Sequence, residues 1–152
     1  MGTVQLYFKT PPKVTLSITN TCNLDCRYCY GDCGRPSTVP EMSIAEWNSF
    51  IAYLIDNGVV ELFIEGGEPL SKPGFEDLLA SCARRLMTMV RTHGTLIDGN
   101  VAQRWKDIGV GRVFVDVMGA TAATHDHMSG RAGSFDKTCE AIGHLVASGV
   151  PT

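Results

Sequence analysis

The feature that most constrains the fold is a pattern that the chain repeats four times: a short apolar segment, a loop, and a segment with helical spacing of apolar residues. The second apolar segment is apolar at nearly every position, which is typical of a parallel strand buried on both faces. Strands that alternate with helices form a parallel sheet with right-handed crossovers. The pattern therefore predicts an α/β fold with strands at residues 14–18, 59–64, 88–91 and 112–117.

The segments with helical spacing carry the boundary signals of helices. The first helix is expected to begin at Ser43, with Glu46 three residues later as in a capping box, and to end at residues 57–58. Cys82 and Cys139 fall on the apolar stripes of the second and fourth helices, so we expect both to be small residues of the core. The remaining helices are expected to begin near Phe75, Asn100 and Ser134.

The length limits how much of a barrel the chain can form. Its 152 residues correspond to one domain, whereas a closed eight-stranded barrel takes about 250 residues. Residues 150–152 look like the start of a fifth strand. We therefore predict one domain over residues 1–152, an incomplete (β/α) TIM-like barrel of four βα units that stops before the fifth strand. Unpaired edge strands would invite a second chain to complete the barrel.

The composition argues against several classes of protein. Hydrophobic residues make up 44% of the chain and charged residues 19%, as in a folded domain. The net charge is −3 and Arg84-Arg85 is the only adjacent basic pair, so no nucleic-acid partner is expected. No apolar run approaches the roughly 18 residues of a membrane span, and no signal-peptide pattern is present. We therefore expect a cytoplasmic protein without membrane contact.

The loop after the first predicted strand concentrates cysteines. Cys22, Cys26 and Cys29 have the spacing C-x3-C-x2-C, and three thiolates so placed can hold three irons of a cubane cluster while the fourth iron stays open to another ligand. Cys33 extends the pattern to C-x3-C-x2-C-x3-C, which leaves a four-cysteine iron–sulfur or zinc site as an alternative. Crowded cysteines of this kind suit metal ligation in a reducing compartment better than disulfides.

The second predicted strand ends at Gly66-Gly67-Glu68-Pro69. Two glycines at a strand end let the backbone approach a ligand closely. A simple strand-ending turn is the other interpretation of such a segment. Because the cysteine loop lies one βα unit earlier, and the carboxyl ends of parallel strands carry the sites of α/β proteins, we expect the two segments to meet.

Together these segments resemble the radical S-adenosylmethionine (radical SAM) superfamily, and most closely its peptide- and protein-maturase (SPASM-type) branch. The loop is similar to the family signature C-x3-C-x-aromatic-C, with Tyr28 as the aromatic residue, and the strand end to the family's GGEP motif. The resemblance implies the first four units of a (β/α)6 partial barrel. It also implies a [4Fe-4S] cluster on the three cysteines, and S-adenosyl-L-methionine positioned by Tyr28, Gly66, Gly67 and Glu68.

Later segments resemble the family with departures. His93 stands in a T-H-G-T stretch where the family often has T-N-G-T, and Ser129 stands where an arginine is expected. Asp116 replaces a serine often near the ligand's ribose, so it either accepts from a ribose hydroxyl or is a strand-end carboxylate facing solvent. His125 and Asp126 are expected to cap their loop rather than to act in acid–base chemistry.

The chemistry that the resemblance implies is reductive cleavage of S-adenosylmethionine to a 5′-deoxyadenosyl radical that abstracts hydrogen from a peptide or cofactor-precursor substrate. An electron donor such as flavodoxin or ferredoxin is an expected partner. No residue stands out as a catalytic base. Two alternatives stay open: a non-enzymatic four-cysteine metal-binding module, and an inactive fragment of a longer enzyme. We expect four units alone to bind a cluster poorly or to turn over little.

Overall fold

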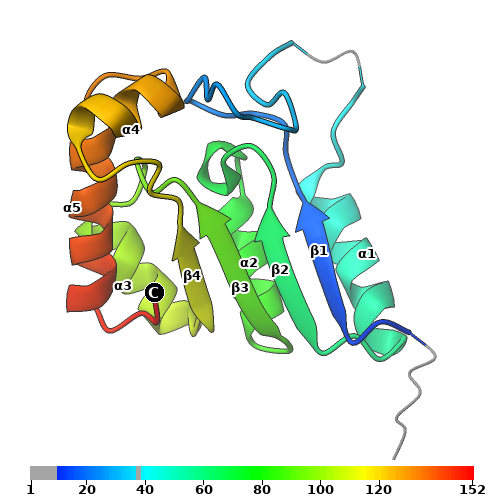
Figure 1. Cartoon of the computed structure of the whole chain (residues 1–152). Coiled ribbons are helices and arrows are strands. Elements are labelled where there is room, and N and C mark those ends of the chain that lie inside the picture. The colour runs from blue at the N-terminus through cyan, green and yellow to red at the C-terminus, as the bar shows by residue number, and fades with distance from the viewer. Residues whose placement is uncertain (1–9, 37–38) are drawn as a thin grey trace, which may run out of the picture.

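A computed structural model describes residues 10–36 and 39–152. Four parallel strands form one sheet in the order β1-β2-β3-β4, which is their order in the chain. The predicted α/β architecture is confirmed, and the sheet is not closed into a barrel (Figure 1). The strands are β1 (Lys13–Ser17), β2 (Glu61–Glu65), β3 (Met87–Thr92) and β4 (Arg112–Val115).

Helices α1, α2 and α3 cover one face of the sheet, whereas α4 and α5 lie beside and above β4 (Figure 1). The predicted capping box is present: the Ser43 hydroxyl accepts from the Glu46 amide, and the Glu46 carboxylate accepts from the Ser43 amide. None of the helices in the described part of the chain is long and apolar enough to cross a membrane. The helices are α1 (Ile44–Asp56), α2 (Phe75–Ala83), α3 (Gly99–Ile108), α4 (Ala122–Ser129) and α5 (Ser134–Ala147), with a short 3-10 helix η1 (Pro69–Ser71) after β2.

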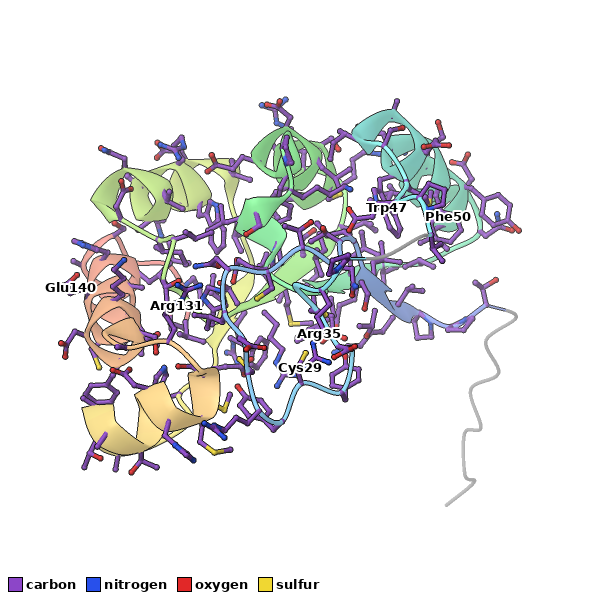
Figure 2. All side chains as sticks on the ribbon, turned by 90° about the horizontal axis from the view of Figure 1, so that it is seen from above. Cys29, Arg35, Trp47, Phe50, Arg131 and Glu140 are labelled. Atoms are coloured by element: carbon purple, nitrogen blue, oxygen red, sulfur yellow. The ribbon has the colours of Figure 1, made fainter. Side chains whose placement is uncertain are left out.

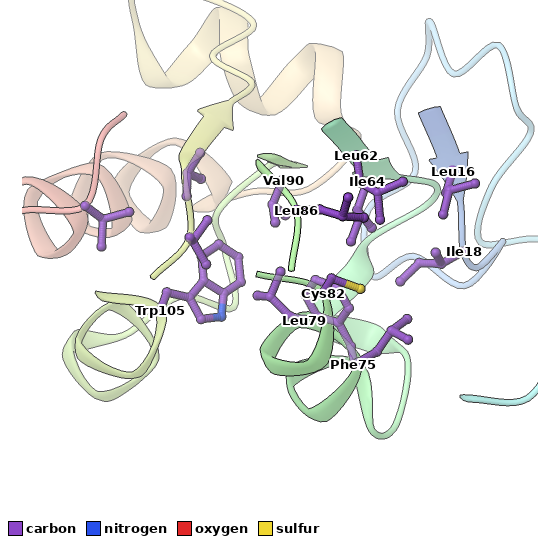
Figure 3. Packing of buried hydrophobic residues seen from close by; sticks show 14 of the residues in the cluster. Leu16, Ile18, Leu62, Ile64, Phe75, Leu79, Cys82, Leu86, Val90 and Trp105 are labelled. Atoms are coloured by element: carbon purple, nitrogen blue, oxygen red, sulfur yellow. The ribbon is translucent and has the colours of Figure 1, made fainter. Parts of the chain in front are cut away.

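The core lies between the sheet and the helices that cover it, and Figure 3 shows its packing around α2 and α3. In β2, Leu62 and Ile64 are fully buried on this side, whereas Glu61 and Phe63 point to the other face and stay partly exposed. The expectation that this strand is buried on both faces was therefore wrong. Its open face has no covering layer because the sheet does not close, so the strand alternates with the period of two of a one-sided sheet.

The packing face of α5 also differs from the prediction. Cys139, expected in the core, is exposed, whereas Cys82 is fully buried as predicted. Helix α5 instead buries Thr138 and Ala141, and a Cβ added at Gly94 would lie only 3.1 Å from the Ala141 Cβ. The helix approaches the end of β3 so closely that small residues are required at the contact. Further along α5, Leu145 is fully buried, as its place in the apolar stripe predicts, whereas Val146 is exposed.

The last residues of the chain run against β4. The Val113 amide donates to the Pro151 carbonyl at 2.8 Å, although residues 150–152 do not form a strand. In Figure 1 the C-terminus accordingly lies beside the lower end of β4. The predicted fifth strand is thus represented only by this contact at the sheet edge.

Candidate metal centre and ligand cavity

All the predicted site residues except Glu68 line one cavity above the carboxyl ends of the strands. Its volume is about 220 Å³, and its walls come from the cysteine loop and from the ends of β2, β3 and β4. In the view from above, the labelled Cys29 and Arg35 of the cysteine loop lie on the side of the sheet opposite α1, α2 and α3 (Figure 2). The lining residues are Cys22, Cys26, Tyr28, Cys29, Tyr30, Cys33, Glu65, Gly66, Gly67, Arg91, His93 and Asp116.

Backbone hydrogen bonds join the start of the cysteine loop to the end of β2. The Gly67 amide donates to the Thr19 carbonyl and the Glu68 amide to the Thr21 carbonyl, both at 2.8 Å. A Cβ added at Gly66 or Gly67 would lie closer to the Thr19 or Thr21 carbonyl oxygen than real Cβ atoms do. The two glycines, expected to admit a ligand, are thus also required by the approach of the cysteine loop itself.

Helix α4, in a segment that we expected to be a loop, supports the cysteine loop on the opposite side. The Asp25 and Arg27 amides donate to the Ser129 and Met128 carbonyls at 3.1 and 2.9 Å. The carbonyl groups at a helix C-terminus lack partners within the helix, and here the cysteine loop supplies them. Arg131, which follows α4, donates to the Asn23 carbonyl at 3.1 Å and points toward the loop (Figure 2).

Sequence signals for α4 existed at its two ends. Thr121 caps the helix by accepting from the Thr124 amide, and Gly130 ends it with a left-handed backbone at φ 68°. Between these ends no apolar stripe marks the segment as a helix. His125 and Asp126 act as caps, as predicted: His125 Nδ1 accepts from the Met118 amide, and Asp126 accepts from amides at the start of α5.

Glu68 is fully buried and does not line the cavity. Its Oε2 accepts from the Thr92 hydroxyl at 2.7 Å and the His93 amide at 3.2 Å, and its Oε1 accepts from the Leu70 amide at 3.1 Å. Burial raises the pKa of Glu68 to about 7. The carboxylate therefore fixes the end of β3 to the end of β2 rather than facing a ligand.

His93 connects Glu68 to the cysteine loop. Its Nδ1 accepts from the Thr95 amide, so Nε2 carries the hydrogen and lies 3.1 Å from Glu68 Oε2 and 3.0 Å from Asn23 Oδ1. Burial lowers the pKa of His93 to about 4, so the ring is neutral at pH 7. The contact with Glu68 is therefore a hydrogen bond of a neutral imidazole and not an ion pair.

The thiols of the loop sit in an environment that disfavours thiolate. Burial raises the pKa of Cys22 and of Cys26, and burial together with the neighbouring Cys29 raises that of Cys33 to about 11. The Cys33 amide donates to Cys29 Sγ at 3.3 Å. Because metal ligation needs thiolates, a metal centre here would displace protons on binding. Among the described residues, no group of three or more His, Cys, Asp or Glu side chains is arranged to hold a single metal ion.

Two lining residues predicted from the family resemblance face the cavity from different sides. Tyr28 is 44% exposed, and burial raises the pKa of its hydroxyl. Asp116 follows β4 and pairs with Arg91, whose Nε lies 3.1 and 3.0 Å from its two carboxylate oxygens. Asp116 thus lies at the cavity wall and is paired with Arg91, which differs from the interpretation of a strand-end carboxylate that faces solvent.

Comparison with known proteins gives one family and many relatives. A family model described as the Radical SAM superfamily matches residues 16–152. An AdoMet-dependent heme synthase of Methanosarcina barkeri is 33% identical over 135 residues, which cover 87% of this chain and 38% of that protein. The sporulation killing factor maturation protein SkfB of Bacillus subtilis is 30% identical over 148 residues, covering 93% of this chain and 34% of SkfB.

A likeness to solved structures supports the fold. Streptococcus suis SuiB, solved bound to the precursor peptide SuiA, superposes with a TM-score of 0.79 at 18% identity, covering 92% of this chain and 31% of SuiB. This chain therefore spans about a third of the length of these relatives.

Proposed function

This chain belongs to the radical SAM superfamily, whose members use a [4Fe-4S] cluster and S-adenosylmethionine, and we propose that it carries the cluster- and cofactor-binding part of a radical enzyme. In this proposal Cys22, Cys26 and Cys29 hold the cluster. When bound, the cluster and S-adenosylmethionine supply a 5′-deoxyadenosyl radical for hydrogen abstraction. The observation that carries the proposal is the convergence of these three thiols with Gly66 and Gly67 on one 220 Å³ cavity.

The residues around the cavity fit such a pair of groups. If Cys22, Cys26 and Cys29 are the ligands, the fourth cluster position is left to another ligand, in the cavity that the backbone of Gly66 and Gly67 also lines. That backbone offers polar groups without side chains to obstruct a ligand. Tyr28 supplies an aromatic ring at the cavity wall, where the adenine of the ligand would pack.

Glu68 and Asp116 take different parts in this proposal. Buried Glu68 positions the site through Thr92 and His93, without contacting the ligand. Asp116 accepts from a ligand hydroxyl while Arg91 balances its charge. Neither residue transfers a proton, because in this chemistry the radical abstracts the hydrogen.

A peptide is the substrate that we propose. SkfB is named as a maturation protein and SuiB was solved with a precursor peptide, and both match more than nine-tenths of this chain. We further propose that the protein is cytoplasmic, since crowded free thiols need a reducing compartment, and that a flavodoxin or ferredoxin supplies the electron. Residues 1–152 would form the N-terminal portion of the radical SAM core, completed by further chain or by a second chain.

A four-cysteine metal-binding module is the second candidate, because the Cys33 thiol lines the same cavity as the other three. Counting iron, sulfide and zinc after anaerobic reconstitution separates the two candidates. The radical enzyme predicts four irons and four sulfides per protein and formation of 5′-deoxyadenosine when a reductant and S-adenosylmethionine are added. Stoichiometric zinc without an iron–sulfur centre would support the module instead.

Cysteine variants make the test specific. Cys26→Ala is expected to lose the cluster and the cleavage of S-adenosylmethionine. Cys139→Ala is the matched control, because it removes an exposed thiol that is far from the site in sequence. This variant is expected to keep the cluster and the cleavage of S-adenosylmethionine. Cys33→Ala is expected to keep the cluster, because its backbone amide remains to donate to Cys29 Sγ. Loss of the cluster in Cys33→Ala would support the four-cysteine alternative.

A further inference from the structure

Three residues, Thr19 to Thr21, connect the two halves of the proposed site. They lead directly into Cys22, and their carbonyl groups accept from the Gly67 and Glu68 amides. Any shift of this short segment would move the first cysteine relative to the backbone of Gly66 and Gly67. What holds the segment in place therefore determines how the cluster loop is aligned with the end of β2.

Glu41 holds this segment from the far end of the cysteine loop. Its carboxylate accepts from the Thr19 hydroxyl at 2.9 Å and from the Asn20 amide at 2.5 Å. The Gly34 amide donates to the Asn20 carbonyl at 2.7 Å. These bonds close the loop on itself at Asn20, which reduces the conformational entropy that cluster binding has to overcome.

Lys72, which directly follows η1, forms an ion pair with Glu41. Its ammonium lies 2.9 Å from Glu41 Oε2, and its side chain is only 9% exposed. Partial burial raises the pKa of Glu41, but Lys72 and the Asn20 amide outweigh burial and hold it at about 2. The carboxylate is therefore charged throughout the physiological range. Neither Glu41 nor Lys72 lines the cavity, so both can act on it only through the residues they hold.

We propose that Glu41, fixed by the nearly buried ammonium of Lys72, is a positioning residue that aligns the cluster loop with the ligand-binding end of β2. Ion pairs of this kind are weak evidence for added stability, because desolvation offsets most of the attraction. Their specific effect is on geometry: the Glu41 carboxylate accepts from a hydroxyl and an amide of residues 19–20 and from the ammonium of Lys72, so it joins two segments that are far apart in the sequence. The inference rests on the proposed function, since alignment matters only if the two segments share a ligand.

The test compares Glu41→Gln with Glu61→Gln in anaerobically reconstituted protein. Gln keeps the shape of the side chain but weakens its bonds and leaves Lys72 without a counter-charge. Glu61 pairs with Lys13 at 2.7 Å on the open face of the sheet, outside the cavity, and is the matched control. The readouts are the dissociation constant of S-adenosylmethionine and the electron paramagnetic resonance spectrum of the reduced cluster with and without it.

Glu41→Gln is expected to weaken S-adenosylmethionine binding about tenfold, as removal of supporting contacts around metal sites does, and to change the spectrum of the ligand-bound cluster. Glu61→Gln is expected to match wild type. If Glu41→Gln fails to fold, Thr19→Val removes the hydroxyl that donates to Glu41 and also accepts from the Thr21 amide at 3.0 Å, and it is expected to shift binding in the same direction. Lys72→Arg keeps the charge and is expected to retain most of the affinity.

Wild-type affinity and spectrum in Glu41→Gln, or in Thr19→Val where that variant replaces it, would overturn the inference. A wild-type protein that shows no spectral response to S-adenosylmethionine would instead contradict the proposed function, so the two failures are distinguishable.

Discussion

At the scale of single residues, Gly67 shows how a motif can be required by the protein's own packing. The space that a Cβ would need at this position is taken by the Thr21 carbonyl oxygen, which accepts from the neighbouring Glu68 amide. A side chain here would push the cysteine loop away from the end of β2. The effect would therefore reach the cluster even if the side chain touched no ligand.

We predict that Gly67→Ala destabilises the fold by about 1–3 kcal/mol, the usual range for overpacking, and lowers the cluster content after reconstitution. Gly143→Ala is the control, because a Cβ there meets nothing within 4 Å and lies within α5. In that helix the change should add about 0.5–1 kcal/mol of stability. Urea unfolding and iron analysis check both. A Gly67→Ala protein with full cluster content would contradict the packing account.

The buried Glu68–His93 pair predicts a pH effect. The pKa of His93 falls from 6.5 to about 4 on folding, so the unfolded state binds more protons between these values and stability is lost as pH falls through them. The pKa of Glu68 rises from 4.5 to about 7, so the folded state binds more protons there and stability is lost as pH rises. The two trends oppose each other between pH 4.5 and 6.5.

His93→Asn removes the first trend and leaves the second. Relative to wild type, its free energy of unfolding should fall with rising pH by about 1 kcal/mol per pH unit between roughly pH 5 and 6. Glu68→Gln is the reciprocal variant, and its stability should rise with pH over the same interval relative to wild type. Denaturant unfolding at three pH values measures both slopes, and parallel pH profiles for all three proteins would refute the opposing titrations.

At the scale of elements, α4 supports the site through the carbonyl groups of its last turn, one of which also accepts from Arg27 Nε at 2.9 Å. Its C-terminal carbonyls receive the Asp25 and Arg27 amides, so the order of the cysteine loop depends on the order of this helix. Thr121 caps its start as Ser43 caps the start of α1. Both caps stabilise the first turn of their helix, but only α4 contacts the Asp25 and Arg27 amides of the cysteine loop.

We predict that Thr121→Ala and Ser43→Ala each cost about 1 kcal/mol of stability, the usual value of an N-cap. Only Thr121→Ala should also increase hydrogen exchange at the Asp25 and Arg27 amides and reduce cluster retention. Equal exchange in both variants would show that α4 does not order the loop.

The elements also show which features the sequence could predict. Local patterns predicted the four strands, the capping box of α1 and the contact of the cysteine loop with residues 66–67. These predictions were confirmed. The helix α4 lacks an apolar stripe, and the buried face of α5 is set by close approach to Gly94, so neither could be predicted from periodicity. Glu41 and Lys72 are single charged residues 31 positions apart, and only the fold brings them together.

At the scale of the whole molecule, the sheet is covered on one face only, and the edges of β1 and β4 have no neighbouring strand in the described part of the chain. The contact from Val113 to Pro151 begins to cover the edge of β4. We expect the four units alone to take up a cluster at low yield and to cleave S-adenosylmethionine slowly, because an unclosed sheet leaves the cavity open to water. Comparison with a form that carries the rest of the barrel measures this, and full cleavage by the four-unit chain would contradict it.

The most direct test of the account is Mössbauer spectroscopy of the protein reconstituted with ⁵⁷Fe. Spectra are recorded with and without S-adenosylmethionine, and the signals of the four irons of the cluster are compared. Three irons held by Cys22, Cys26 and Cys29 should keep their signals, while the signal of one iron changes when the ligand is added. An unchanged spectrum, or a protein that assembles no iron–sulfur centre, would contradict the central claim that these three thiols leave one cluster position for the cofactor.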